Sequence, residues 1–223
     1  MKKIGICEGS KYSNYEDWLK EPQFEIIRIG YKYNNLKDVK NCDGIVLTGG
    51  SDVSSELYSG SSGNAMEEVS DRQRDEFEWK IMEHVYEKQK PLLAICRGMQ
   101  FVNVFYGGTL IPDLSHSSKM IHSKPGNGDD RMHSVSLDKH SAIYKIVSEE
   151  KGMISSGHHQ AIDQIGEGLK VTAVAPDGII EALEKKENPQ GKFFLLIQWH
   201  PERTMDKKSA FSEKIKQAFL ESL

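Results

Sequence analysis

The stretch from Pro91 to Gly108 constrains the fold of this chain more than any other segment. It opens with a proline and the apolar run LLAI, which is typical of a short strand buried on both faces. The run stops at Cys96, and residues with helical spacing follow as far as the glycine pair GG. A strand, one nucleophilic residue, a glycine two places on and a helix make a nucleophile elbow, where the helix N-terminus stabilises a thiolate. We therefore predict that Cys96 is a catalytic nucleophile; the alternative is a buried structural cysteine.

Short apolar segments recur along the chain and predict a mostly parallel sheet. The expected strands are 3–7, 24–29, 44–47, 91–95, 133–137, 170–175, 179–184 and 191–199. The expected helices are 15–20, 71–87 behind a capping box of Ser70 and Gln73, 99–106, and one from about residue 207. Early strand–helix alternation places helices on both faces of the sheet. We expect one α/β domain over residues 1–223, with added antiparallel strands in its central third.

Composition excludes several classes of partner. The chain is 28% charged and 38% hydrophobic, with a net charge of −4, so neither nucleic acid nor a membrane surface is an expected partner. Apolar runs are too short for a membrane span, and the N-terminal apolar run ends at Glu8, too early for a signal peptide. Three cysteines without a C-x-x-C spacing indicate a reducing compartment. We expect a cytoplasmic protein, and the sequence indicates no oligomeric state.

A thiol nucleophile needs a base, and the segment WHPE supplies a candidate. It follows the apolar run FFLLI, which predicts a central strand whose carboxyl end lies beside that of the elbow strand. In extended chain His200 and Glu202 share a side, and Pro201 disfavours helical geometry at His200. We predict that His200 is the base and Glu202 its orienting acid. The alternative is a surface turn.

Acyl chemistry also needs donors for an oxyanion. The amide of Arg97, directly after the nucleophile, is one donor by the geometry of an elbow. A second is expected from the loop TGGS, which follows the 44–47 strand and whose glycines let the backbone approach a substrate. No phosphate-binding glycine pattern is present. We assign the second donor to Gly50.

Together these segments resemble the class I glutamine amidotransferase-like superfamily. The likeness rests on LTGGSD, AICRGMQ and QWHPE, which occur in the expected order over nearly the whole chain. Ala94 stands where the amidotransferases usually carry glycine, and AICRGMQ is more similar to the stand-alone γ-glutamyl hydrolase branch. The resemblance implies a flavodoxin-like three-layer sandwich, a Cys96–His200–Glu202 triad, and Ser51 and Gln100 as substrate-binding residues.

Two further segments resemble that branch. DRQRDE at residues 71–76 is similar to its helix-opening R-D element, and SSGHHQ is similar to its N-S-x-H-x-Q loop, with Ser155 in place of Asn. By that resemblance Ser156, His158 and Gln160 line the site.

No metal or cofactor is expected. A metal site at His158-His159 is disfavoured because adjacent residues on a strand point apart. The remaining histidines in this half of the chain, interpreted as surface or flap residues without a role, are His116, His122, His133 and His140. Residues 113–130 are interpreted as a polar loop or flap.

The parts predict hydrolysis of a γ-glutamyl amide through a thioester, with release of glutamate. The resemblance offers γ-glutamyl-GABA as a substrate, and an overall likeness to a capsule-pathway hydrolase favours γ-glutamyl-CDP-amidate of a capsule phosphoramidate pathway. In the second case Arg97, Lys119 or Lys124 would meet phosphate. The alternatives are a glutaminase subunit that delivers ammonia to a partner synthase, and a non-catalytic binding protein on the same fold.

Overall fold

The structure is a computed structural model, and it describes residues 1–59, 70–116, 122–123 and 131–223. The helices are α1 (Tyr12–Leu19), α2 (Glu56–Ser59), α3 (Arg72–Lys88), α4 (Arg97–Phe105), α5 (Ala142–Val147) and α6 (Glu213–Glu221). The strands are β1 (Lys2–Cys7), β2 (Phe24–Ile29), β3 (Gly44–Leu47), β4 (Leu92–Ile95), β5 (Leu110–Ile111), β6 (Arg131–Leu137), β7 (Lys151–Ser156), β8 (Ala161–Ile162), β9 (Leu169–Val174), β10 (Ile180–Lys185) and β11 (Phe194–Ile197).

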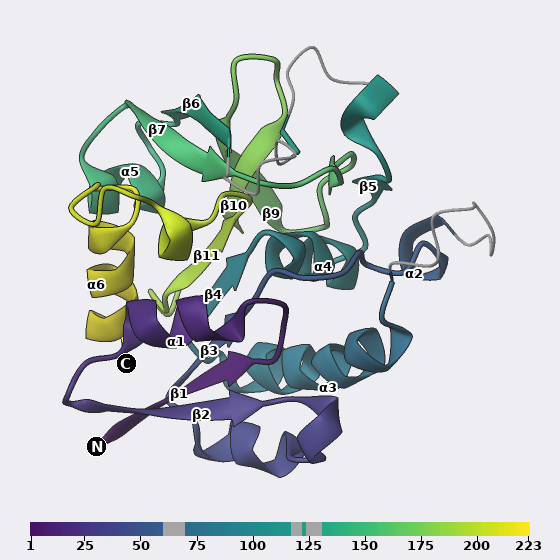
Figure 1. The fold of residues 1–223 in the computed structure, drawn as a ribbon, viewed down its shortest axis with the longest axis vertical. Coiled ribbons are helices and arrows are strands. Elements are labelled where there is room, and N and C mark those ends of the chain that lie inside the picture. Colours follow the sequence, from purple (N-terminus) through teal and green to yellow (C-terminus); the bar gives the residue numbers. More distant parts are fainter. Residues whose placement is uncertain (60–69, 117–121, 124–130) are drawn as a thin grey trace.

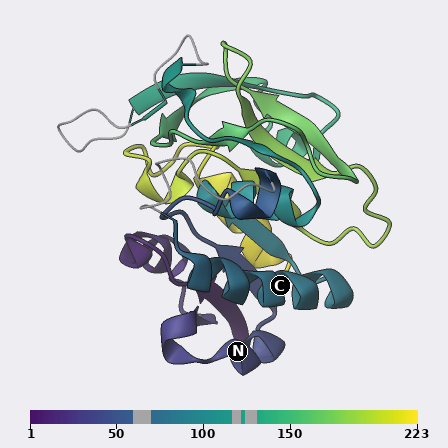
Figure 2. The same ribbon diagram turned by 90° about the vertical axis from the view of Figure 1, so that its right-hand side faces the viewer.

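The described strands form one large sheet and one small one. The large sheet has the order β2-β1-β3-β4-β11-β10-β9-β6-β7, and β5 pairs with β8 separately. From β2 to β11 the pairings are parallel, and from β11 to β7 they are antiparallel. The antiparallel strands, in green, lie at one end of the molecule, and the N-terminal strands, in purple, lie at the other (Figures 1 and 2). The molecule therefore has a parallel half and an antiparallel half.

Helices cover both faces of the parallel half, and alternate strand residues point to each face. Ile4, Leu93 and Leu195 pack with α1 and α6 in one core cluster. Ile45 and Leu92 pack with α3 and α4 in the other. The period of two explains why these strands are apolar at consecutive positions. The predicted three-layer α/β sandwich is confirmed.

The carboxyl ends of three central strands meet at one edge of the sheet. β3 leads into Thr48, β4 into Cys96 and β11 into Gln198. β4 lies between β3 and β11, with Ala94 opposite Leu47 on one side and Leu196 on the other. The three segments predicted to carry chemistry are therefore neighbours in space.

Several sequence-based boundaries differ from the structure. The N-cap of α3 is Asp71, whose side chain accepts from the Arg74 amide at 3.1 Å, in place of the predicted Ser70. An aspartate is a stronger acceptor at this position, because it adds a favourable charge at the helix N-terminus. Helix α6 begins at Glu213, later than expected, and α5 and β7 were not predicted.

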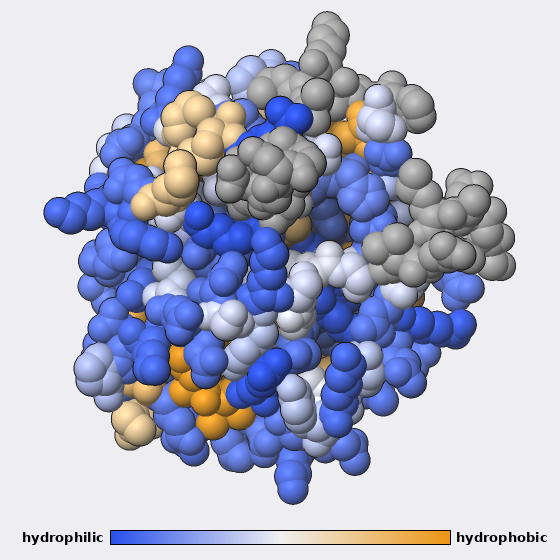
Figure 3. All heavy atoms as spheres, viewed as in Figure 1, coloured by the Kyte–Doolittle hydropathy of each residue, from blue (hydrophilic) through white to orange (hydrophobic). Residues whose placement is uncertain are grey.

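The face drawn in Figure 3 is mostly hydrophilic, with a small apolar area between α1 and β2. In the described part of the chain, no helix is both long and apolar enough to cross a bilayer.

Candidate active site

The elbow holds Cys96 in a strained backbone conformation. Its φ of 55° and ψ of −110° lie where L-residues are rarely found. The Cys96 amide donates to the Ile197 carbonyl at 2.7 Å, so the turn is fixed to β11. A Cβ at Gly98 would lie 2.5 Å from the Leu47 carbonyl oxygen, so only glycine permits this close packing of helix on strand. The strain presents the thiol at the N-terminus of α4.

His200 and Glu202 form a buried hydrogen-bonded pair. The distance between His200 Nδ1 and Glu202 Oε1 is 2.8 Å, and both side chains are less than a tenth exposed. The chain after His200 is a short 3₁₀ turn from Pro201 to Arg203, so the predicted extended geometry is wrong, although the two side chains do meet. The turn brings the Glu202 carboxylate back to the ring of His200, which directly precedes the turn.

Electrostatics favour the imidazolium form of His200. Burial acts against the charged ring, but the Glu202 charge and the charge and hydrogen bond of Cys96 outweigh it and raise the pKa of His200 to about 9. Because His200 Nδ1 is bonded to Glu202, the other ring nitrogen, Nε2, is available to the Cys96 sulfur. At neutral pH the site therefore holds a proton donor beside the nucleophile.

A cavity of about 180 Å³ opens between these residues and the glycine loop. Cys96, His200 and Gly50 line it, together with Lys11 and Arg203. An ideal Cβ on Gly49 would lie 3.1 Å from His200 Cε1 and 3.6 Å from Cys96 Cβ, which shows how closely the loop approaches the pair.

The two predicted oxyanion donors have amides available for a ligand. Gly49 N donates to the Tyr15 hydroxyl at 2.9 Å, whereas no acceptor for the Gly50 amide occurs among the described residues. Gly50 has a φ of 152°, a conformation that favours glycine. The Arg97 amide is the first of α4 and has no acceptor within the helix. The proposed roles of Gly50 and Arg97 remain predictions.

A buried ion-pair network supports both the loop and the elbow. Arg74 donates from Nη1 to the Gly49 carbonyl at 3.0 Å and from Nη2 to the Thr48 carbonyl at 2.9 Å. Its Nε donates to Glu78 at 2.8 Å, and Glu78 also pairs with Arg97. These charged side chains are at most 6% exposed, so each depends on its partners.

The side chain of Arg97 is not available to a phosphate, contrary to the sequence-based expectation. It is 1% exposed and bonds to Asp75 and Glu78 on α3. A guanidinium with two buried carboxylate partners is held in place and has no path to a ligand. The other two expected cations, Lys119 and Lys124, lie outside the described residues, as does most of the 113–130 segment.

Four of the five predicted substrate-binding residues, all except Ser51, are buried and do not line the cavity. Gln100 donates to the Gln160 carbonyl at 2.9 Å, and Ser156 Oγ donates to the His122 carbonyl at 3.0 Å. Ser156, His158 and Gln160 are at most 5% exposed. The residue of this loop that lines the cavity is Gly157. Low exposure does not exclude contact with a substrate, because Cys96 and His200 are themselves only 7% and 5% exposed. Substrate contact by these four side chains, and by Ser51, which is partly buried beside Gly50, remains a prediction.

Sequence reasoning missed Tyr15, which lines the cavity and holds the Gly49 amide. Burial raises the pKa of its hydroxyl, so it stays protonated. Tyr15 lies 34 residues from Gly49 in the sequence, so no local sequence pattern connects the two. His122 and His133 are also not surface residues, at 1% and 5% exposed; His140 is exposed as expected.

Comparison with known proteins identifies the family of this chain. The Peptidase C26 family model matches residues 29–202. The chain belongs to the Peptidase C26 family. This family is class I glutamine amidotransferase-like, as the resemblance predicted, and membership supports a hydrolase.

Among curated relatives of this Peptidase C26 chain, the glutamine amidotransferase-like protein YvdE of Lactococcus lactis is 40% identical over 191 residues, covering 84% of this chain and 78% of the relative. The γ-glutamyl-γ-aminobutyrate hydrolase PuuD of Escherichia coli is 31% identical over 168 residues, covering 72% and 64%.

Solved structures agree on the fold. A glutamine amidotransferase from Thermotoga maritima has a TM-score of 0.64 at 12% identity, covering 99% of this chain and 84% of its own. The glutaminase domain of Trypanosoma brucei CTPS with bound acivicin has a TM-score of 0.66 at 15% identity, covering 100% and 95%. At these identities the likeness concerns the fold alone.

Proposed function

We propose that this Peptidase C26 chain is a cysteine-dependent γ-glutamyl hydrolase that cleaves a γ-glutamyl amide through a thioester. The observation that carries the proposal is the meeting of a strained elbow cysteine, a histidine–carboxylate pair and a glycine loop in one cavity. That set supplies a nucleophile, an acid–base group and oxyanion donors, which are the requirements of acyl transfer.

The first half-reaction acylates the enzyme. The Cys96 thiolate attacks the γ-carbonyl carbon, and the amides of Arg97 and Gly50 hold the oxygen as it becomes negative. The tetrahedral intermediate collapses with rupture of the C–N bond, and the His200 imidazolium gives its proton to the departing nitrogen. The products are a free amine and a γ-glutamyl thioester on Cys96.

The second half-reaction consumes one water. Neutral His200 removes a proton from the water as its oxygen attacks the thioester carbon. Collapse expels the Cys96 thiolate and releases glutamate, with His200 again protonated. Glu202 keeps the ring oriented and stabilises its charge through both halves.

The size of the cavity favours recognition of the glutamyl group rather than of the leaving amine. A volume of about 180 Å³ is below the range of about 300–1,000 Å³ usual for drug-sized ligands. Lys11 and Arg203 line the cavity, and their positive charges suit an acyl group that carries a carboxylate, with Arg203 Nε also 3.6 Å from Glu202 Oε1. A larger leaving group would extend outside.

For the leaving group we favour the CDP-amidate of γ-glutamyl-CDP-amidate, with γ-glutamyl-GABA as the competing substrate. The family likeness to PuuD, a protein named for the GABA conjugate, supports the second. A nucleotide leaving group would need cations other than Arg97, whose side chain is already paired.

The test is a substrate panel. Purified protein is incubated with glutamine, γ-glutamyl-GABA and γ-glutamyl-CDP-amidate, and released glutamate is measured, with Cys96→Ala as the control. We expect glutamate from a γ-glutamyl conjugate with the protein alone. Activity on glutamine only, and only beside a synthase, would instead identify the glutaminase subunit named above as the alternative.

A further inference from the structure

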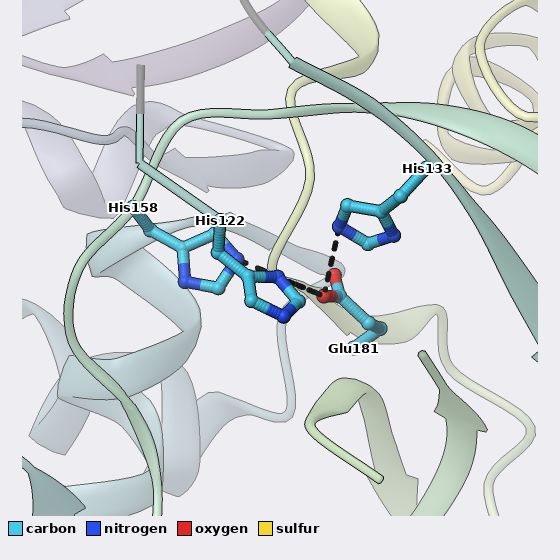
Figure 4. Close-up of side chains that lie close together, drawn as sticks. All are labelled: His122, His133, His158 and Glu181. Carbon is cyan, nitrogen blue, oxygen red and sulfur yellow. Dashed lines mark ion pairs between the residues drawn. The ribbon is translucent and has the colours of Figure 1, made fainter. Parts of the chain in front are cut away.

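Three histidines and a glutamate from four separate segments converge in the antiparallel half of the molecule. They are His122, His133 on β6, His158 after β7, and Glu181 on β10. The imidazoles surround the carboxylate of Glu181, as Figure 4 shows. All four residues are at most 5% exposed, and their ligand-type atoms lie within 4.8 Å of one another. Buried polar groups normally have hydrogen-bond partners, so this cluster requires an explanation.

Each imidazole has one nitrogen bonded outward. His122 Nε2 meets Asp177 Oδ2 at 3.0 Å, His133 Nδ1 meets the Ser134 carbonyl at 3.0 Å, and His158 Nδ1 meets the Gln160 carbonyl at 2.9 Å. A carbonyl oxygen only accepts, so these nitrogens of His133 and His158 carry the proton. At His122 the partner is the Asp177 carboxylate, which also accepts, so Nε2 carries the proton there and Nδ1 is the unprotonated nitrogen. This is the outer hydrogen bonding that fixes metal-ligating histidines.

The inward nitrogens are left without hydrogen bonds. His122 Nδ1, His133 Nε2 and His158 Nε2 have no hydrogen-bond partner among the described residues, and neither do the two oxygens of Glu181. These nitrogens are lone-pair acceptors facing a carboxylate, which also only accepts. Hydrogen bonds within the cluster cannot satisfy all of them, whereas one cation would take all three nitrogens and an oxygen of Glu181 as ligands.

The distances from Glu181 Oε1 to the three inward nitrogens are close to the ligand–ligand distances around a small tetrahedral cation. Glu181 Oε1 lies 3.5 Å from His122 Nδ1, 3.5 Å from His133 Nε2 and 3.7 Å from His158 Nε2. These distances exceed the usual hydrogen-bond range of about 2.7–3.2 Å. Ligands about 2.0–2.2 Å from a zinc ion at the centre of a tetrahedron are about 3.3–3.6 Å apart.

The charges also suit a divalent ion. Glu181 and Asp177 are both buried carboxylates, and two positive charges on the ion would balance them with all three imidazoles neutral. The competing arrangement has no metal and a protonated His122 between Asp177 and Glu181. It leaves His133 and His158 facing the carboxylate with lone pairs.

We propose that His122, His133, His158 and Glu181 form a structural zinc site. Three imidazole nitrogens and one carboxylate oxygen are ligands that zinc accepts, and a complete set of four protein ligands is typical of a structural rather than a catalytic ion. The inference is independent of the proposed hydrolase activity.

The site would hold the wall of the catalytic cavity. The His158 amide and Ser156 Oγ both bond to the His122 carbonyl, so two ligand segments are already docked on each other. Gly157, between those two residues, lines the cavity. The His200 amide donates to the Ser155 carbonyl at 3.0 Å, and the Gln198 amide donates to the Glu181 carbonyl at 2.8 Å. An ion at the cluster would therefore fix the Ser155 and Glu181 carbonyls, to which the amides of His200 and Gln198 donate.

The first experiment uses the unaltered chain, purified without chelators from zinc-supplemented cells. We expect one zinc per chain by elemental analysis, and a lower melting temperature after chelation that zinc restores. Replacement by cobalt should give the visible bands of a tetrahedral site with nitrogen and oxygen ligands, without a sulfur charge-transfer band. Absence of zinc together with absence of a cobalt spectrum would overturn the proposal in favour of the protonated network.

Substitutions then locate the ion. His133→Ala should lose zinc and the cobalt bands, whereas His140→Ala, which alters an exposed histidine in the turn after β6, should keep both. Asp177→Asn should weaken zinc binding by about 10–100-fold, because it alters the outer partner of His122. Cys96→Ser should retain the ion; its loss there, or a sulfur band in the unaltered chain, would place the metal at the catalytic thiol and reject the site. If His133→Ala does not fold, the chelation and cobalt results on the unaltered chain decide.

Discussion

The molecule has two buried histidine–carboxylate sites, and the loop after β7 belongs to both: Gly157 lines the catalytic cavity and His158 belongs to the interior cluster. The two sites differ in the distance between histidine nitrogen and carboxylate oxygen. In the catalytic cavity the His200 Nδ1 to Glu202 Oε1 distance is 2.8 Å, which is a hydrogen bond. In the interior cluster the shortest such distance to Glu181 is 3.5 Å, and the inward nitrogens have no hydrogen bond within the described residues. The same two residue types thus hold a proton in one place and leave room for an ion in the other.

Their surroundings explain the difference. The cavity lies where parallel strands end, and a thiol stands next to the imidazole. The cluster lies among antiparallel strands, where each imidazole is fixed from outside by an oxygen acceptor. We infer that the first site moves protons and the second is static, and the following variants test that separation.

Cys96→Ala should have the largest effect on activity. Without the sulfur no thioester forms, so kcat should fall by about 10⁴-fold or more, with residual rate from the oxyanion donors alone. Glutamate release in the substrate panel measures this. Zinc content should not change, because no cluster ligand contacts the thiol. Retention of full turnover would exclude Cys96 as the nucleophile.

Glu202→Gln should have the next largest effect, and it should alter the pH profile. In the parent chain His200 carries its proton up to a pKa of about 9, so kcat/KM should decline as the pH rises through that value and the leaving nitrogen loses its donor. Removing the Glu202 charge lowers the pKa of His200, so the decline should move to lower pH. By analogy with other triads kcat should fall by up to about 10⁴-fold.

A matched experiment on the other site sharpens this result. Glu181→Gln removes the corresponding carboxylate from the cluster, and it should weaken zinc binding while leaving the alkaline limb near its parent position. If the alkaline decline of kcat/KM shifts in Glu181→Gln but not in Glu202→Gln, the roles assigned to the two sites are reversed.

The contrast also shows what the sequence could reveal. The strands expected at 44–47 and 91–95 were predicted nearly to the residue, because parallel strands buried on both faces are apolar at every position. The strand expected at 191–199 exists but is shorter, since β11 covers Phe194–Ile197. The elbow, the glycine loop and the His200–Glu202 pair each occupy a few adjacent residues, so short motifs identified them. Local patterns were sufficient for the parallel half.

The antiparallel half depends on contacts that no local pattern records. β7 reads KGMISS and α5 has six residues, so neither has a periodicity long enough to recognise. One signal was available: in β6 the buried face includes His133 with Val135 and Leu137, a period of two that marks the histidine as internal. Nothing in the sequence joins it to Glu181, because pairing through β9 brings those strands together.

Gly50→Ala should reduce the rate by about 10²–10³-fold, which is the cost of one oxyanion donor. The added Cβ would lie 2.2 Å from Arg74 Nη1, and a φ of 152° is strained for alanine, so the amide must shift. The effect should fall on kcat rather than KM. Melting temperature and zinc content serve as controls, and an unchanged kcat would assign the oxyanion contact elsewhere.

Tyr15→Phe should have the smallest effect. The substitution removes the acceptor of the Gly49 amide and leaves that buried donor unsatisfied, at a cost of about 1–3 kcal/mol. Part of this appears as lost stability, so we expect about a tenfold lower kcat/KM and a reduced melting temperature. The ring still packs in the core, and Arg74 still holds the Gly49 and Thr48 carbonyls. The loop therefore keeps its path but holds its amides less firmly, and the zinc content of this variant should equal that of the parent. A Tyr15→Phe loss as large as that of Gly50→Ala would mean that the hydroxyl contacts the substrate itself.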